Sequence, residues 1–239
     1  MRYPLALLLL LALPAGASET ILVVGDSHTA GAFGLALDDA LRAAPGARVA
    51  TFGVCSARPQ SYFSETPHGC GHRFRDFDKS APAKWLGGRV YMEKRGGKDV
   101  EMVKTPELAQ LLSDHHPSIV VVALGSNLPI SGSSVQKTLD MIHLTGAACV
   151  WIGPPDMRNP TRKEVDAVYA TLDKNNVSAS ATLEAAKKDS CILVDSRAFS
   201  YLRYPADAGG GTHYDGKLAG LGTRWGADAA KAVLAAAKP

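Results

Sequence analysis

The segment Gly25-Asp26-Ser27-His28 is where residue type and position point most directly to chemistry. It follows the apolar run Ile21–Val24 and precedes the helical pattern of residues 32–41, so a serine stands where a buried strand gives way to a helix. Ligands bind at this carboxyl edge in open α/β sheets, and the start of a helix stabilises developing negative charge. The placement favours Ser27 as a nucleophile, although Gly-Asp-Ser is also common in turns and helix caps.

Three further features could supply what acyl transfer from an ester also needs: a base for the proton of the nucleophile and donors aimed at the oxyanion. Gly53 stands near the end of the second apolar run, and Gly125-Ser126-Asn127 follows the third. His213 comes after a run of glycines and before the last helical pattern. Each feature is ordinary by itself, because glycine is common in turns and asparagine in caps.

Taken together and in this order, the four features resemble the SGNH (GDSL-type) hydrolase family, and the resemblance covers nearly the whole chain after its N-terminal segment. It implies a three-layer α/β/α sandwich with Ser27 as the nucleophile and His213 as the general base. The amides of Ser27 and Gly53 and the side chain of Asn127 would form the oxyanion hole. No metal or organic cofactor is implied.

The chain departs from the family pattern at the third catalytic position. The family places an aspartate three residues before the histidine, and here that position is Gly210. Asp207 is the nearest upstream carboxylate, and the glycines between them would let the loop fold back onto His213. Asp215 is closer in sequence but lies on the helix side. A backbone carbonyl that accepts the Nδ1 proton is the remaining alternative, and it would leave Ser27 and His213 as a dyad. We favour Asp207 slightly, because the glycine-rich run has an evident purpose only if the loop folds back.

The identity of the residue after Ser27, His28, indicates a class of substrate. Many lipolytic members carry leucine after the serine, whereas Gly-Asp-Ser-His-Thr resembles the branch that acts on O-acetylated carbohydrate, including peptidoglycan O-acetyl esterases. The plainer interpretation is that His28 caps the helix start. The leading hypothesis is an exported serine esterase that removes a short acyl group, chiefly acetyl, from a carbohydrate such as a cell-wall glycan. The alternatives are acyl transfer to a glycan hydroxyl, hydrolysis of a lipid ester or thioester, and a non-catalytic glycan-binding protein on the same fold.

The elements that position these residues alternate between short apolar runs and helical patterns. Continuous hydrophobicity is what a parallel sheet buried on both faces requires. Helices are expected over residues 105–115, with Thr105 as the hydroxyl cap, and over 135–144, 161–188 and 217–237. The predicted fold class is α/β, a three-layer sandwich with a five-stranded, mainly parallel sheet of the flavodoxin-like form that the resemblance implies. The expected strands are Ile21–Val24, Arg48–Val54, Ser118–Leu124, Ala148–Ile152 and Cys191–Val194.

Residues 18–239 are expected to form one domain with an insertion at about residues 56–104. Within the insertion, Val90–Met92 and Val100–Met102 flank Gly96-Gly97, which predicts a β-hairpin. Long insertions of this kind are often functional, for example as substrate-binding flaps. The basic residues of the segment also fit a solvated charged face.

The N-terminus and the cysteines indicate export. Residues 1–17 combine Arg2, the apolar stretch Leu5–Leu13 and the end Ala15-Gly16-Ala17, as in a secretory signal peptide. The stretch is too short to span a membrane, and no cysteine follows it for lipid attachment, so we expect a secreted or periplasmic protein without a stable membrane anchor. A formal net charge of +3 gives no reason to expect nucleic acid as a partner. The expected partner is an ester-bearing glycan or another small ester.

The four cysteines suggest two disulfides in an exported protein. Cys149 and Cys191 each begin a predicted parallel strand, and consecutive strands often lie side by side. We therefore expect these two to pair, and Cys55 to pair with Cys70 at the start of the insertion. No Cys-x-x-Cys spacing occurs, so a zinc site is not indicated.

Overall fold

The computed structural model describes residues 19–77, 89–157, 161–199, 201–202, 213–214 and 216–238. The expected signal peptide at residues 1–17 lies outside these ranges, as do Asp207, Gly210 and Asp215. No helix in the described ranges is long and apolar enough to cross a membrane.

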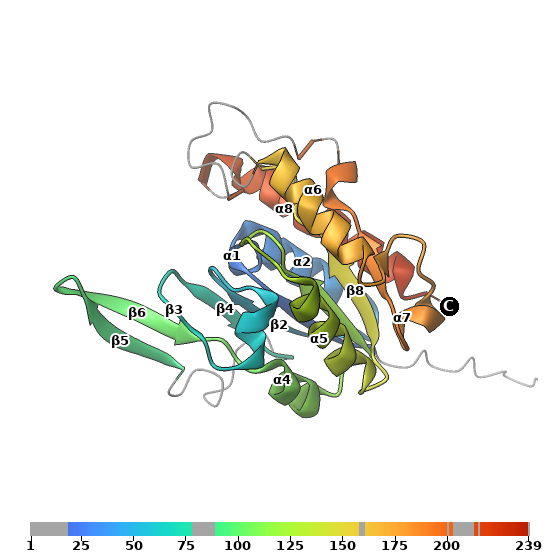
Figure 1. Ribbon diagram of the computed structural model, residues 1–239, viewed down its shortest axis with the longest axis horizontal. Helices are drawn as coiled ribbons and strands as arrows, with labels where there is room; N and C mark the ends of the chain where they lie inside the picture. The colour runs from blue at the N-terminus through green and yellow to red at the C-terminus, as the bar shows by residue number, and fades with distance from the viewer. Residues whose placement is uncertain are drawn as a thin grey trace, which may run out of the picture.

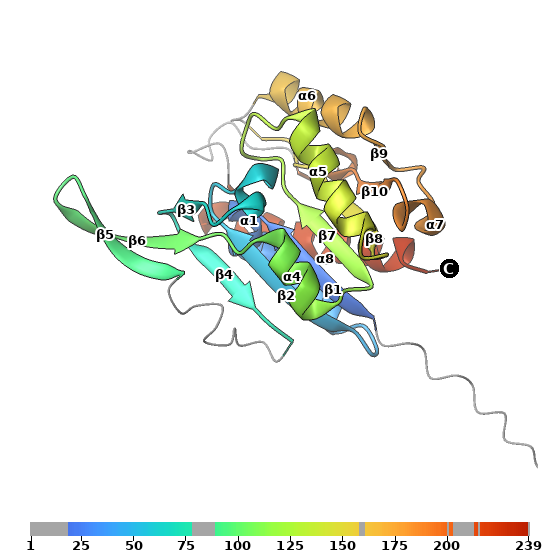
Figure 2. The same cartoon turned by 60° about the horizontal axis from the view of Figure 1, so that its bottom comes forward.

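A mixed sheet forms the centre of the fold, in the order β4-β2-β1-β7-β8-β10-β9 (Figures 1 and 2). Its five central strands are parallel and match the five expected runs. Alternate residues of each strand face opposite sides, so Ile21 and Val23 pack on one face while Leu22 and Val24 pack on the other. The strands are β1 (Thr20–Gly25), β2 (Arg48–Val54), β4 (His72–Arg75), β7 (Ile119–Ala123), β8 (Ala148–Ile152), β9 (Val177–Ser178) and β10 (Cys191–Val194).

The prediction of five strands is too low by two, because each edge of the sheet carries one more. β4 pairs antiparallel with β2, and β9 adds two residues beside β10. Among the four residues of β4 only Phe74 is buried. Charged side chains on an edge strand are one way in which proteins prevent pairing with a strand of another chain. Neither strand carries a continuous apolar run, so a search for buried strands misses both.

Helices cover both faces of the sheet, which confirms the three-layer sandwich. α2 (Ala32–Arg42) and α8 (Ala219–Ala236) pack on one face, and α4 (Leu108–His115) and α5 (Gly132–His143) on the other (Figure 1). α6 (Arg162–Asp173) contributes to both apolar clusters. The expected helix over 161–188 is wrong as one element. Asn176, with φ 60°, follows the end of α6, and β9 and the short α7 (Leu183–Ala186) come after it.

The expected helix at 105–115 forms with a different start. Thr105 is not its cap, because the Thr105 hydroxyl donates to the carbonyl of Thr66 at 2.8 Å. Glu107 is the N-cap residue instead, without a side-chain cap hydrogen bond, and α4 begins at Leu108. Thr105 therefore joins the start of this helix to the insertion.

The insertion folds into a second, three-stranded sheet in the order β3-β6-β5. Its hairpin consists of β5 (Val90–Arg95) and β6 (Lys98–Lys104), and β3 (Pro67–His68) pairs with β6. Gly96 and Gly97 have φ values of 58° and 79°, so both occupy the left-handed region that a two-residue hairpin turn requires. The predicted hairpin is confirmed, and it extends away from the main sheet (Figures 1 and 2).

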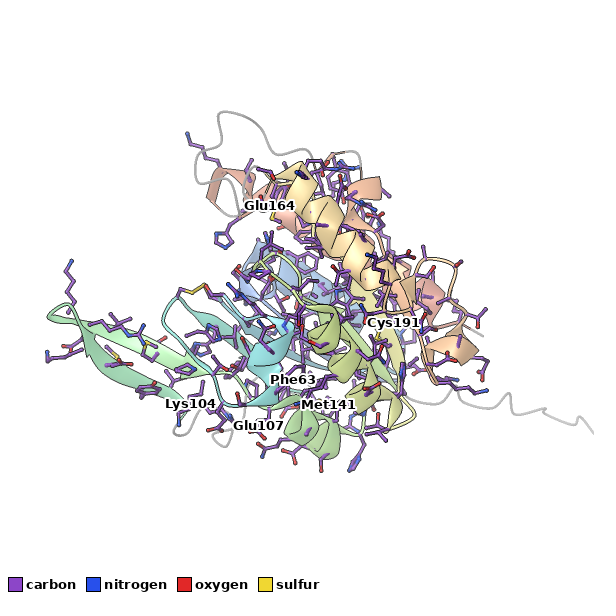
Figure 3. The ribbon with its side chains drawn as sticks, in the orientation of Figure 1. Phe63, Lys104, Glu107, Met141, Glu164 and Cys191 are labelled. Atoms are coloured by element: carbon purple, nitrogen blue, oxygen red, sulfur yellow. A yellow bond between two sulfur atoms is a disulfide. The ribbon has the colours of Figure 1, made fainter. Side chains whose placement is uncertain are left out.

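Two disulfides join the expected pairs of cysteines. Cys149–Cys191 links the neighbouring strands β8 and β10 (Figure 3), and Cys55–Cys70 fastens the start of the insertion. Their sequence separations are 42 and 15 residues. In the chain-entropy model such loops restrict the unfolded chain by about 4 and 3 kcal/mol respectively. Both cross-links therefore favour the folded state.

Candidate active site

The nucleophile candidate lies at the junction that the sequence predicts. Ser27 is the first residue of α1 (Ser27–Ala30), two residues after the end of β1, and its side chain is buried. Asp26 is the N-cap residue: its Oδ1 accepts from the backbone N–H of His28 at 3.0 Å. Its Oδ2 accepts from the backbone N–H of Ser126 at 3.3 Å, so one carboxyl group joins the turn at Ser27 to the loop after β7. Burial raises the pKa of Asp26 to about 6.

The structure brings Ser27 and His213 together across 186 residues of sequence. Nε2 of His213 lies 2.9 Å from Oγ of Ser27, a hydrogen-bonding distance that suits a serine hydroxyl donating to a base. His213 itself is exposed, whereas Ser27 is 8% exposed. Ser27 and His213 therefore have the geometry of a candidate nucleophile and its base.

Tyr214 anchors the segment that carries His213. Its side chain is buried, and its hydroxyl donates to the backbone carbonyl of Asp156 at 2.5 Å. On the other side, α8 approaches closely, because a Cβ at Gly222 would lie 2.5 Å from the carbonyl oxygen of Tyr214. The sequence analysis missed Tyr214, since an aromatic residue after a loop histidine has no distinguishing pattern. Its burial fixes the chain next to His213.

Asn127 lies in the loop between β7 and α5. Its Nδ2 donates to the backbone carbonyl of Ala57 at 3.1 Å, which fixes the side-chain amide against the loop after β2. A side-chain amide has two N–H groups, so the second could donate to an oxyanion. Gly125, two residues earlier, has φ 142°, a conformation that favours glycine. The loop thus needs both its glycine and its asparagine.

Gly53 is placed differently from the expectation. It lies within β2 opposite Arg73 of β4, and two residues later the N–H of Cys55 donates to Gly71 at 3.0 Å. Hydrogen-bonded pairs recur at every second residue of an antiparallel ladder, so the N–H of Gly53 also faces β4. A Cβ at Gly53 would lie 2.7 Å from backbone atoms of α1. This corrects the expectation: the amide of Gly53 serves the sheet, and its missing side chain lets α1 pack closely.

Tyr62 is a second residue that the sequence analysis missed. It lies in η1 (Pro59–Phe63), a 3₁₀ turn of the insertion, and its hydroxyl accepts from the backbone N–H of Gly25 at 3.2 Å. The same hydroxyl lies 2.7 Å from the carbonyl oxygens of Gly25 and Phe52. Burial raises the pKa of Tyr62 far above its ordinary value, so the group stays a neutral donor. It binds the ends of β1 and β2 just before Ser27.

The third catalytic position lies outside the described residues. Asp207, Asp215 and the glycines at 209–211 all fall there, so each alternative for the group that orients His213 stays a prediction.

The chain has similarities among known proteins, although no protein-family model matches it. Protein BcsX of Komagataeibacter xylinus is 30% identical over 153 residues, with 58% of this chain and 51% of BcsX covered. The chain thus spans about half the length of that curated relative. The solved structure of the psychrotrophic esterase EstA from Pseudoalteromonas sp., inhibited by monoethylphosphonate, aligns with a TM-score of 0.49 and 12% identity over 91% of this chain and 99% of that chain. TesA aligns with a TM-score of 0.38 and 16% identity over 65% of this chain and 72% of its own.

The motifs stand where the sequence resemblance requires them. Ser27 follows β1, Asn127 follows β7, and His213 precedes α8. The chain resembles the SGNH hydrolases. The parallel order β2-β1-β7-β8-β10 is the flavodoxin-like arrangement that the resemblance implies.

Proposed function

We propose that this chain is an exported serine esterase that removes a short acyl group, chiefly acetyl, from a carbohydrate of the cell envelope. The observation that carries the proposal is the 2.9 Å distance between Oγ of Ser27 and Nε2 of His213. A hydroxyl paired with an imidazole at the carboxyl edge of an α/β sheet is the arrangement that nucleophilic catalysis on esters uses.

In the proposed reaction, Oγ of Ser27 attacks the carbonyl carbon of the ester while its proton passes to Nε2 of His213. The tetrahedral intermediate collapses, the bond to the alcohol breaks, and His213 returns the proton to the departing alkoxide. Water then attacks the acyl-enzyme with the same histidine as base, which releases the acid and restores Ser27. A group that accepts the Nδ1 proton of His213 would hold the productive tautomer. We retain Asp207 for this role.

The oxyanion needs donors on the side of the site near Asn127. We assign one to the side chain of Asn127 and one to the backbone N–H of Ser27. Because Nδ2 of Asn127 lies 3.1 Å from the carbonyl of Ala57, the loop at residues 55–57 is next to this position. The N–H groups of Cys55 and Ala57 already donate to the carbonyls of Gly71 and Val54. We therefore assign the third donor to the backbone N–H of Ser56 in place of Gly53. The disulfide Cys55–Cys70 restrains the same loop.

Export and a carbohydrate substrate are the finer parts of the proposal. The two disulfides support an oxidising compartment. The N-terminal pattern of residues 1–17 supports export. The resemblance at Gly-Asp-Ser-His supports an O-acetylated glycan.

The test begins with Ser27→Ala and a chromogenic acetyl ester. We expect hydrolysis to fall by several orders of magnitude, and a fluorophosphonate to add one mass increment to the wild type but none to the variant. Ser113→Ala is the matched control, because Ser113 lies exposed on α4. Equal labelling of wild type and Ser27→Ala would refute the assignment of the nucleophile.

A substrate panel then addresses the finer proposal. Release of acetate from an acetylated glycan, faster than hydrolysis of longer acyl esters, supports a carbohydrate esterase. Preference for long acyl chains would refute it in favour of a lipid or thioester hydrolase. Transfer of acetyl to an added sugar at the expense of hydrolysis would identify an acyltransferase.

A further inference from the structure

We propose that His28 is a positioning residue, which holds the imidazole of His213 in the orientation that reaches Ser27. The inference rests on the proposed function and goes beyond it, because the proposed reaction gives His28 no step.

The placement of His28 is the first observation. Its side chain is 4% exposed, and its ring lies between the rings of His213 and Trp225. The ring centroids of His28 and His213 are 5.5 Å apart at an interplanar angle of 61°. Those of His28 and Trp225 are 5.2 Å apart at 75°. Both are edge-to-face arrangements, which aromatic rings favour.

The exposure of His213 is the second observation. His213 is an exposed residue, and its ring contacts the buried ring of His28. Trp225 of α8 backs His28 in turn. His28 thus lies in contact with the buried ring of Trp225 and with the exposed ring of His213.

Hydrogen bonding gives the third observation. Nε2 of His28 is buried and has no hydrogen-bond partner among the described protein atoms. A buried polar atom without a partner disfavours folding, and an apolar side chain of similar size would avoid this cost. His28 therefore acts through the contacts of its ring and not through a hydrogen bond of Nε2.

The charge state of His28 fits the same role. Burial, with the nearby charge of His213 as a second cause, lowers the pKa of His28 to about 3. A neutral ring does not add a second positive charge beside the imidazolium that His213 forms during the reaction. Its low pKa also makes His28 a much weaker base for the proton of Ser27 than an ordinary histidine. His28 can therefore remain beside His213 throughout the cycle.

The test compares His28→Leu with Phe33→Leu as a matched control. Phe33 is buried and stacks on the other ring neighbour of His28, with a centroid distance of 3.8 Å to Trp225. Misplacing a catalytic group by about 1 Å can cost on the order of 100-fold in rate. We therefore expect His28→Leu to lower kcat roughly 10- to 100-fold with KM unchanged. The rate of fluorophosphonate labelling should fall by the same factor.

The control separates positioning from stability. Phe33→Leu should lower Tm at least as much as His28→Leu while kcat stays near that of the wild type. His28→Phe restores a ring and should recover most of the lost kcat. His28→Gln lacks the ring but keeps a polar planar group, so it carries the same expectation as His28→Leu if the leucine variant does not fold.

Two results would overturn the inference: wild-type kcat in His28→Leu or His28→Gln, or an equal loss of kcat in Phe33→Leu. Neither result would contradict the proposed function. That function is tested by Ser27→Ala in the same assay, where retained hydrolysis would show that Ser27 is not the nucleophile.

Discussion

Removal of one hydroxyl group, in Tyr62→Phe, should loosen the strand end that carries Ser27. The hydroxyl of Tyr62 accepts from the N–H of Gly25 at 3.2 Å and lies 2.7 Å from the carbonyl oxygens of Gly25 and Phe52. A hydroxyl has one proton, so it donates to one carbonyl at a time. Phenylalanine fills the same space but leaves the N–H of Gly25 and one carbonyl without the partner that Tyr62 provides.

The magnitude follows from the number of groups affected. Each buried polar group left without a partner costs about 1–3 kcal/mol. The N–H of Gly25 is such a group, and the hydrogen bond lost at a carbonyl adds about 0.5–1.5 kcal/mol, so the free energy of unfolding should fall by about 2–4 kcal/mol. For a chain of this size, 1 kcal/mol corresponds to roughly 2–4 °C in Tm, so Tm should fall by about 4–16 °C. Because Gly25 precedes Asp26 and Ser27, kcat should fall as well.

Thermal and urea unfolding of wild type and Tyr62→Phe measure this loss, and a chromogenic acetyl ester measures turnover. Tyr91→Phe is the matched control, because Tyr91 lies in the hairpin and its hydroxyl makes no hydrogen bond to the described residues. The control should change stability by less than about 0.5 kcal/mol. If Tyr62→Phe unfolds at the same temperature as the control, the hydroxyl does not hold the strand end and the reasoning is wrong.

Two further predictions concern the helix interface and Asp26. Gly226→Ala should destabilise by about 1–3 kcal/mol, because the new Cβ would lie 2.2 Å from a backbone carbonyl of α2. Gly220→Ala lies in open space on the same helix and should stabilise by about 0.5–1 kcal/mol. Urea unfolding compares the two, and equal stabilities would contradict the close packing of α2 and α8. Asp26 binds its proton more tightly in the folded state, since burial raises its pKa to about 6. Its contribution to stability is therefore complete below pH 4 and is lost as the pH rises through 6, by about 3 kcal/mol. Unfolding at pH 4 to 7 should show this decline in the wild type and a flatter curve in Asp26→Asn; parallel curves would argue against it.

The central sheet could be predicted from the sequence because burial on both faces leaves a strong pattern. Runs such as Ile21–Val24 and Ala148–Ile152 have no polar residue, and both became central strands. The two edge strands of the sheet left no such pattern in the sequence. β4 alternates charged residues with Phe74, and β9 is two residues long. Asn176 ended the expected long helix through a left-handed backbone conformation, which apolar periodicity does not report.

The site was predictable where it follows strand ends and less so where it depends on side-chain contacts. Ser27 and Asn127 lie in the segments that follow the carboxyl ends of β1 and β7, so their positions follow from the topology. Gly53 was misplaced because its ladder partner, β4, was not foreseen. Tyr62 and Tyr214 act through hydroxyl groups on distant backbone atoms, and one sequence does not show which distant atoms a hydroxyl reaches.

The candidate site is held mainly by side chains that bind the backbone of another segment. Tyr62 ties the end of β1 to the insertion, Asp26 ties the turn at Ser27 to the loop after β7, and Asn127 ties that loop to the loop after β2. Each of these hydrogen bonds joins two segments that the main sheet does not pair with each other. The insertion is therefore part of the support of the site as well as an extension from the fold. Its η1 segment carries Tyr62, whose loss would remove a hydrogen bond from the end of β1.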